Sequence, residues 1–411
     1  MFLCRRLGLV LFAILIPFDP LSTAAQELTE EDALRRLDRE NARMRALAAR
    51  VELVRAESRG RSLAPNPSVF YSREDAAGTQ DDFLAVQQSV PISGRLGLLN
   101  SAGNSALNAA AAQTDFERLQ LRSDFRASFY ALLLAQQRVT TLEAWTLQLR
   151  EIVSILQQRE QEGEGSRFDR LRAERESSDA AANLASAQVE LAQARSRMAA
   201  FLAPGTDPTS LRVQGSFSSD TPVPQLGELM DGAWSNRGDY MAAQLQLEQL
   251  GFERRAAARL AVPEPILSAG LKRSAALDRT GNGYLFSVTL PVPLFDRGQT
   301  AVARLRAAGE QAEAELLGRR SQIETEVSAA LETVRLRRRM ATEYARQLSE
   351  PGADLSQIGR LAYEEGEQGI LELLDAYRVS LAANLRSLEL DWSAKQAGIE
   401  LDRVAGREVL P

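Results

Sequence analysis

The spacing of proline residues constrains this chain more than any other feature. Residues 92–203 and 294–350 contain no proline. Because proline breaks helix interiors, these two gaps are where long helices can form. At about 1.5 Å per residue, a helix of about 60 residues would reach roughly 90 Å, which is longer than a compact domain. We therefore expect an elongated, mainly helical protein.

Each proline-free segment also carries a helical repeat of apolar residues. The apolar positions recur every three or four residues, at Leu142, Trp145, Leu149, Ile152 and Leu156 in the first segment and at Ile323, Val327, Leu331 and Val334 in the second. Such stripes must pack against neighbouring helices. The aromatic content of 6% fits long helices better than a large globular core. A generic coiled coil would explain these helices taken alone.

Four short segments have the alternating pattern of half-buried strands. Residues 266–272 and 284–290 alternate apolar and polar side chains, and the polar loop 274–283 lies between them. Residues 68–73 and 83–90 form an earlier pair around the polar loop 74–82. The sequence therefore predicts two hairpins and a small β part.

The chain also shows an internal duplication. Pro67 matches Pro265 at an offset of 198 residues, Pro91 matches Pro291 at 200, and Gly163 matches Gly366 at 203. Each half is predicted as helix, strand, loop, strand, long helix, glycine turn and returning helix. The predicted boundaries are residues 26–203 and 226–403 for the repeats, with turns near 163–169 and 363–375, a linker at 204–225 and a tail at 404–411.

The N-terminus has the layout of a secretory signal peptide, residues 1–25. Arg5 and Arg6 precede an apolar run at residues 7–16, and small residues follow at 22–25. A membrane anchor is the competing interpretation, but the run is shorter than the roughly 20 residues of a spanning helix. Cys4 precedes the run, so it cannot be a lipid-acceptor cysteine, and the exported chain is expected to contain no thiol.

Composition excludes several classes of function. The chain contains no histidine, which removes histidine-dependent triads and histidine-containing zinc sites. With 49 Lys and Arg against 55 Asp and Glu, the charge disfavours a nucleic-acid partner. A GxxxxGK[ST] phosphate loop is absent, and a narrow helical chain offers no cleft for a glycosidase-type carboxylate pair. We expect no enzyme activity, no cofactor and no resident metal site.

Four strands in an exported chain raise a problem of closure. Strands that face lipid must form a closed barrel, because an open edge leaves backbone groups unpaired in hydrocarbon. Known bacterial barrels have at least about 8 strands, so several copies would have to share one barrel. Three copies would supply twelve strands. The alternative is a soluble hairpin edge in the periplasm.

Three segments carry a resemblance to a known family. The segments are SVTLPVPLFDRGQ (287–299), GEGSRFDRLRAERE (163–176) and YEEGEQGILELLDAYR (363–378). Together with the duplication, they resemble the outer membrane factor family, the TolC-like exit ducts of tripartite efflux and secretion systems. The resemblance covers about residues 28–401. It implies a homotrimer with a shared 12-stranded transmembrane β-barrel in the outer membrane and an α-barrel in the periplasm, docked to a periplasmic adaptor and an inner-membrane pump.

Within that family the chain most resembles the heavy-metal branch, which works with RND pumps for cobalt, zinc, cadmium and copper. The motif PVPLFDRGQ is similar to the motif of that branch but departs from it at Gly298 and Thr300. The expected function is a passive exit duct for heavy-metal cations. A duct for drugs or a type I secreted protein is the alternative, and a periplasmic adaptor or coiled-coil scaffold is a third hypothesis.

The resemblance also implies where the duct is gated. The gate candidates are Asp169, Tyr363, Gln368, Glu372 and Asp375, and the turns that would dock the adaptor contain Gly163, Gly165, Gly366 and Gly369. Gln368 stands where drug-efflux relatives carry an arginine. Three copies of Glu372 and Asp375 facing a lumen would form rings of six carboxylates, which favour cations. Acids at a helix start can instead be solvated and favoured by the helix dipole.

Overall fold

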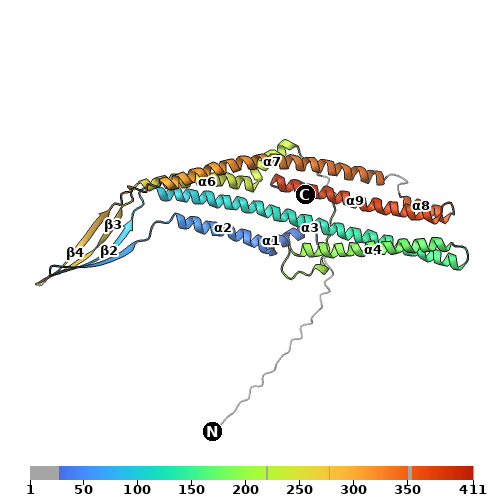
Figure 1. Cartoon of the computed structure of the whole chain (residues 1–411), viewed down its shortest axis with the longest axis horizontal. Helices are drawn as coiled ribbons and strands as arrows, with labels where there is room; N and C mark the ends of the chain where they lie inside the picture. Colours follow the sequence, from blue (N-terminus) through green and yellow to red (C-terminus); the bar gives the residue numbers. More distant parts are fainter. Residues whose placement is uncertain (1–26, 219–220, 277, 350–353, 411) are drawn as a thin grey trace, which may run out of the picture.

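A computed structural model of the chain describes residues 27–218, 221–276, 278–349 and 354–410. The predicted signal peptide, residues 1–25, lies outside the described residues. The molecule is elongated, with a small sheet at one end and helix turns at the other (Figure 1). The expected fold class, mainly α with a small β part, is confirmed. None of the described helices is both long and apolar enough to cross a bilayer.

Before the linker, the described part of the chain forms two helices, then two strands, and then one hairpin of long helices. They are α1 (Glu30–Glu40), α2 (Ala42–Arg61), β1 (Ser68–Ala76), β2 (Thr79–Ser89), α3 (Arg95–Gln161) and α4 (Arg167–Ala199). The two helices of the hairpin lie in the proline-free segment 92–203, as expected. The apolar stripe on α3 is buried throughout, which confirms the predicted packing face.

The elements after the linker follow the same order with one additional break. They are α5 (Leu226–Asn236), α6 (Gly238–Ala258), η2 (Arg259–Ala261), β3 (Ile266–Ala276), β4 (Arg279–Thr289), α7 (Gln299–Leu348), α8 (Leu355–Glu364) and α9 (Ile370–Ala405). The outgoing arm is divided into α7 and α8, whereas α3 is continuous. The predicted stripe on α7 is also buried. From the sheet, α2, α3, α6 and α7 run side by side (Figure 1).

Both long outgoing helices begin at a glycine in the left-handed region. Gly94 has φ 72° and caps α3, and Gly298 has φ 81° and caps α7. A Cβ at Gly298 would also lie 2.4 Å from the Ala257 carbonyl oxygen. The glycine that departs from the heavy-metal motif is therefore the residue that this strand-to-helix junction requires.

The predicted polar loops at 74–82 and 274–283 are wrong, because most of these residues extend the strands. The ladder of β1 and β2 continues to the Ala76 and Thr79 pair, next to Ala77 and Gly78 at φ 52° and 79°. Cross-strand ion pairs satisfy the polar side chains: Arg73 contacts Asp82 at 2.6 Å, and Lys272 contacts Asp81 at 2.7 Å. Alternation of apolar residues does not detect strands stabilised in this way.

The four strands form one antiparallel sheet in the order β1-β2-β3-β4. Pairing of β2 with β3 joins the two halves of the chain. The outward edges of β1 and β4 pair with no other strand among the described residues.

One face of the sheet is apolar, and the other is mostly small or polar, with Phe70, Phe83, Ile266 and Leu285 as the large apolar exceptions. The register places on one face, here called the apolar sheet face, Val69, Tyr71, Leu84, Val86, Leu267, Leu271, Tyr284, Phe286 and Val288. Tyr284 and Phe286 on this face are 81% and 78% exposed. On the opposite face Ala85 and Ser268 are 2% and 6% exposed, so the sheet curves toward its polar side.

The linker and tail are more structured than the sequence indicates. The linker segment 204–225 contains the short helix η1 (Pro208–Ser210), and its Leu211, Val213 and Phe217 are buried in the core formed with α1, α3 and α4. The predicted tail at 404–411 begins too early, because α9 continues to Ala405. That helix ends where Gly406 takes φ 75°.

A buried ion cluster holds the start of α6 against α7. The Arg237 guanidinium contacts the Asp239 carboxylate at 2.8 Å and Glu326 at 2.6 Å, and Arg319 also reaches Asp239 at 3.2 Å. Arg237 and Asp239 are 3% and 4% exposed. Burial acts to raise the pKa of Asp239, but the hydrogen bonds and charges of the two arginines outweigh it, so its pKa is lowered.

Replacing this carboxylate tests the contribution of the cluster. We expect Asp239→Asn to lower the free energy of unfolding by about 3 to 5 kcal/mol at pH 7, since it removes one partner of a buried pair. Thermal unfolding followed by circular dichroism measures the loss. Asp231→Asn on the exposed surface of α5 is the matched control and should change little.

The difference in stability between wild type and Asp239→Asn should also depend on pH. Because the folded pKa of Asp239 is lowered, its stabilisation is fully present above the unfolded value of about 3.9 and is lost as pH falls through the folded pKa. The difference between wild type and Asp239→Asn should therefore shrink in acid. If the difference in unfolding free energy is the same at pH 7 and in acid, this account is wrong.

Candidate functional site

The two helix turns at the end remote from the sheet have the same local geometry. Gly163 and Gly366 have φ of 80° and 78°, a region that glycine reaches at low cost. After Gly163, the Glu164 N–H donates to the Arg159 carbonyl at 2.9 Å, and after Gly366, the Glu367 N–H donates to Ala362 at 2.8 Å. Both turns are Schellman motifs, so each glycine ends its helix and reverses the chain.

The other two predicted turn glycines have different roles. A Cβ at Gly165 would lie 2.8 Å from the backbone nitrogen of Glu160, so this turn folds closely onto the end of α3. Gly369 has an extended backbone and is the N-cap of α9, where a Cβ would lie 3.0 Å from a Glu372 carboxylate oxygen. The four glycines thus lie at the two turns, as expected.

The two hairpin tips pack against each other through an apolar cluster. It contains Trp145, Leu149, Ile152, Leu156, Ala173 and Ala180 from the first hairpin and Ile370, Leu373, Leu374 and Tyr377 from the second. The rings of Trp145 and Tyr377 meet edge to face with centroids 5.7 Å apart. The tips therefore form one packed unit rather than two separate arms.

Polar contacts at the rim complete this unit. The Arg159 guanidinium donates to the Tyr363 hydroxyl at 3.3 Å and lies 5.5 Å from the centre of its ring. Arg378 on α9 forms an ion pair with Glu176 on α4. Pattern analysis missed these contacts because the partners lie about 200 residues apart in sequence.

Glu372 and Asp375 lie on the exposed side of α9, opposite the apolar cluster. Leu373, Leu374 and Tyr377 point into the cluster, whereas both acids are exposed. Residues three apart share one helix face, so the two carboxylates are neighbours. Within the described part of the chain, neither carboxylate forms an ion pair. This arrangement leaves both charges available to a lumen or to solvent.

The remaining gate candidates occupy different positions. Tyr363 is half-buried on α8, where it contacts Arg159 of the first hairpin. Gln368 is exposed in the second turn, and its backbone N–H donates to the Ala362 carbonyl at 3.1 Å. Asp169 is half-buried in the first turn of α4. The structure therefore brings four of the five candidates to the second tip and leaves Asp169 on the first.

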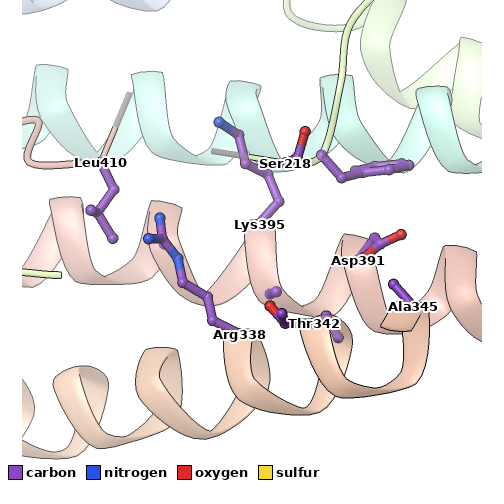
Figure 2. Close-up of a pocket in the computed structure, with 11 residues that line it drawn as sticks. Ser218, Arg338, Thr342, Ala345, Asp391, Lys395 and Leu410 are labelled. Atoms are coloured by element: carbon purple, nitrogen blue, oxygen red, sulfur yellow. The ribbon is translucent and has the colours of Figure 1, made fainter. Parts of the chain in front are cut away.

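A second region with charged side chains is a cavity of about 310 Å³ between α7, α9 and residues 217–218. Figure 2 shows Arg338 and Lys395 extending from their helices in the same direction, with Asp391 further along α9. Arg338 donates to the Thr221 carbonyl at 2.6 Å, and the Lys395 ammonium lies 4.8 Å from the centre of the Tyr130 ring. Burial lowers the pKa of Lys395 and raises the pKa of Asp391. The first contact attaches the linker to α7, and the second attaches α9 to α3.

No group of three or more acidic, cysteine or histidine side chains among the described residues is placed to hold a metal ion. The carboxylates at the tip are spread along helix surfaces instead of converging on one point.

Comparison with known proteins identifies relatives that align with most of the chain. No family model matches it. It is 26% identical over 396 residues to the cobalt-zinc-cadmium resistance protein CzcC of Cupriavidus metallidurans, covering 93% of this chain and 91% of that protein.

Solved structures share the fold. A membrane protein from Pseudomonas aeruginosa aligns with a TM-score of 0.76 at 20% identity, covering 92% of each chain. CusC, described in connection with transmembrane channel formation, aligns with a TM-score of 0.73 at 18% identity, again covering 92% of each chain. The resemblance inferred from the sequence is therefore confirmed: this chain is similar in fold to the TolC-like outer membrane factors and similar in sequence to a cobalt-zinc-cadmium resistance protein.

Proposed function

We propose that this chain is the passive outer-membrane exit duct of a tripartite RND-type efflux system and that it exports heavy-metal cations. It would lie in the outer membrane and extend into the periplasm, where its tip would meet a periplasmic adaptor and an inner-membrane pump. The observation that carries the proposal is the four-stranded sheet, which has one exposed apolar face and two edges that pair with no other strand in the described part of the chain.

The apolar sheet face has to be covered, and lipid is the surrounding that fits it. Its exposed side chains include Tyr71, Val86, Tyr284, Phe286 and Val288, whereas small and polar side chains make up most of the opposite face. Strands of 9 to 11 residues match the length that a tilted transmembrane strand needs. Alternation between an apolar outside and a polar inside is typical of transmembrane barrels.

Closure of that sheet supports a homotrimer. Edges left open in hydrocarbon would expose unpaired N–H and C=O groups. Three copies joined from β4 of one to β1 of the next would give twelve strands and leave no edge. The long helices would then continue as a tube, and α3 alone, with 67 residues, is about 100 Å long. Two repeats per chain, residues 26–203 and 226–403, would supply matched hairpins to the tube.

A duct of this kind needs no catalytic machinery. Energy would come from the inner-membrane pump, and the chain would supply only a path and a gate. We infer that Glu372 and Asp375 face the lumen at the tip, where their exposed and unpaired carboxylates would favour cations. Similarity to a cobalt-zinc-cadmium resistance protein supports metal ions as the cargo. Export of drugs or of a secreted protein is the alternative.

Opposite faces of β4 offer a matched test of membrane insertion. Phe286→Arg places a charge on the apolar sheet face and should cost about 2 to 4 kcal/mol near the bilayer centre, which prevents assembly. Ser287→Arg points to the polar side and should be tolerated. The readout is a heat-modifiable trimer in detergent-extracted outer membranes. A wild-type protein recovered as a soluble periplasmic species would overturn the proposal in favour of an adaptor or scaffold.

Growth of a deletion strain tests the cargo. Without the gene, with plasmid rescue as control, we expect sensitivity to Co, Zn, Cd, Cu or Ag salts but not to a panel of lipophilic drugs. Sensitivity confined to drugs would discard the metal assignment and leave the duct in place.

Neutral isosteres test the gate. The double variant Glu372→Gln and Asp375→Asn should reduce the preference for cations over anions by about tenfold, measured as reversal potentials in planar bilayers. Glu310→Gln, on the exposed surface of α7 and far from the tip, is the control with one carboxylate removed. Unchanged selectivity in the double variant would mean that these acids are merely solvated.

A further inference from the structure

We propose that the apolar sheet face ends in a binding site for the phosphate group of a membrane lipid, centred on Arg273. This inference rests on the proposed function, because it requires the apolar sheet face to lie in a bilayer. The site is at the end of the sheet next to the hairpin turns, remote from the helices (Figure 1).

The strand register arranges the apolar sheet face in successive rows. The row Val69, Val86, Ala269 and Phe286 is followed, toward the turns, by the row Tyr71, Leu84, Leu271 and Tyr284. The next row contains Arg73, Asp82, Arg273 and Asn282. Rows on one face are about 7 Å apart. The surface thus changes from apolar to aromatic to cationic over about 14 Å, which matches the order of acyl chain, interface and head group in a lipid.

The charges in the cationic row leave Arg273 available. Arg73 is engaged with Asp82, since its Nε contacts Oδ1 at 2.6 Å and its Nη2 contacts Oδ2 at 3.2 Å. The Tyr71 hydroxyl also donates to Asp82 Oδ1, at 3.0 Å. Arg273 interacts electrostatically with Asp82 across the row, but it is exposed and forms no ion pair within the described chain. Two arginines against one aspartate leave this row with a net positive charge.

A hollow lies at the boundary between the aromatic and cationic rows. Its volume is about 480 Å³, and its walls include Tyr71, Leu84, Leu271, Tyr284, Arg273 and Asn282. Lys272 and Asp82 also line it, but each is already in an ion pair, with Asp81 and Arg73 respectively. Apolar and aromatic side chains form one part, while a guanidinium and a side-chain amide offer hydrogen-bond donors at the other. A guanidinium binds phosphate oxygens through paired N–H donors. The hollow therefore suits an amphiphile with a phosphate next to acyl chains, and not a free hydrophilic anion.

The position in the membrane selects the leaflet. In the proposed duct the helices occupy the periplasm, so the hairpin turns lie on the external side. The occupant would be a phosphorylated lipid of the external leaflet, with its acyl chains over the apolar rows and its phosphate at Arg273. Such a contact would fix the depth of the barrel in the membrane.

Lipid binding by the purified full-length trimer in detergent tests this site. The probe is bisphosphorylated lipid A, and native mass spectrometry measures the bound fraction. We expect Arg273→Ala to weaken binding about fivefold, the effect of removing one interfacial cation, and Arg273→Lys to weaken it less. Arg279→Ala is the matched control, since Arg279 pairs with Ala276 on the opposite face of the sheet and is also exposed.

Two further comparisons use the wild-type chain and do not depend on the variants folding. Dephosphorylated lipid A should bind at least about fivefold more weakly than the bisphosphorylated form. Equal binding of the two lipids, or equal binding by Arg273→Ala and wild type, would overturn the site. Displacement by millimolar inorganic phosphate would assign it to a free anion and reject the lipid. Failure of the duct itself would appear separately, as a wild-type chain that is absent from outer membranes.

Discussion

The open, one-sided sheet is the constraint on which the rest of this structure depends. Its apolar face is exposed, and the outward edges of β1 and β4 pair with no other strand within the described chain. In water such a sheet would invite edge-to-edge association. In a bilayer it would leave backbone groups unsatisfied. A single sheet of this kind is therefore incomplete by itself, and the number of strands makes additional copies of the chain the simplest way to complete it.

Pairing of β2 with β3 connects that sheet to the helices. These strands come from the two halves of the chain. Because they pair, α3 and α7 both start at the sheet and run in the same direction away from it (Figure 1). Buried charges then hold the helices together. Arg126 on α3 contacts Asp402 on α9 at 2.7 Å and Glu30 on α1 at 2.5 Å, and Asp402 accepts from the Val409 and Leu410 N–H groups. Removing one member of such a network would leave uncompensated charge in the interior.

The tip combines a packed apolar interior with the exposed carboxylates of Glu372 and Asp375, which form no ion pair among the described residues. Trp145, Tyr377 and their neighbours lock the two hairpins together, so a change in the tip must move packed helices and not only a loop. Arg159 of the first hairpin donates to the Tyr363 hydroxyl of the second, whereas Gln368 at the second turn is uncharged. Glu372 and Asp375 are excluded from these contacts. Both carboxylates are exposed because they lie on the face of α9 that points away from the apolar cluster.

The amino-acid sequence by itself determined the elements whose signals are local. Proline gaps and apolar stripes located α3 and α7, and Gly163 and Gly366 marked both reversals, because positive φ and helical periodicity depend on neighbouring residues. Tertiary structure alone decided the rest. The strands extend through residues 74–76 and 79–82 because Arg73 and Lys272 meet acids on other strands, and Arg159 meets Tyr363 only when the hairpins pack. Such contacts join residues far apart in sequence, so no local pattern contains them.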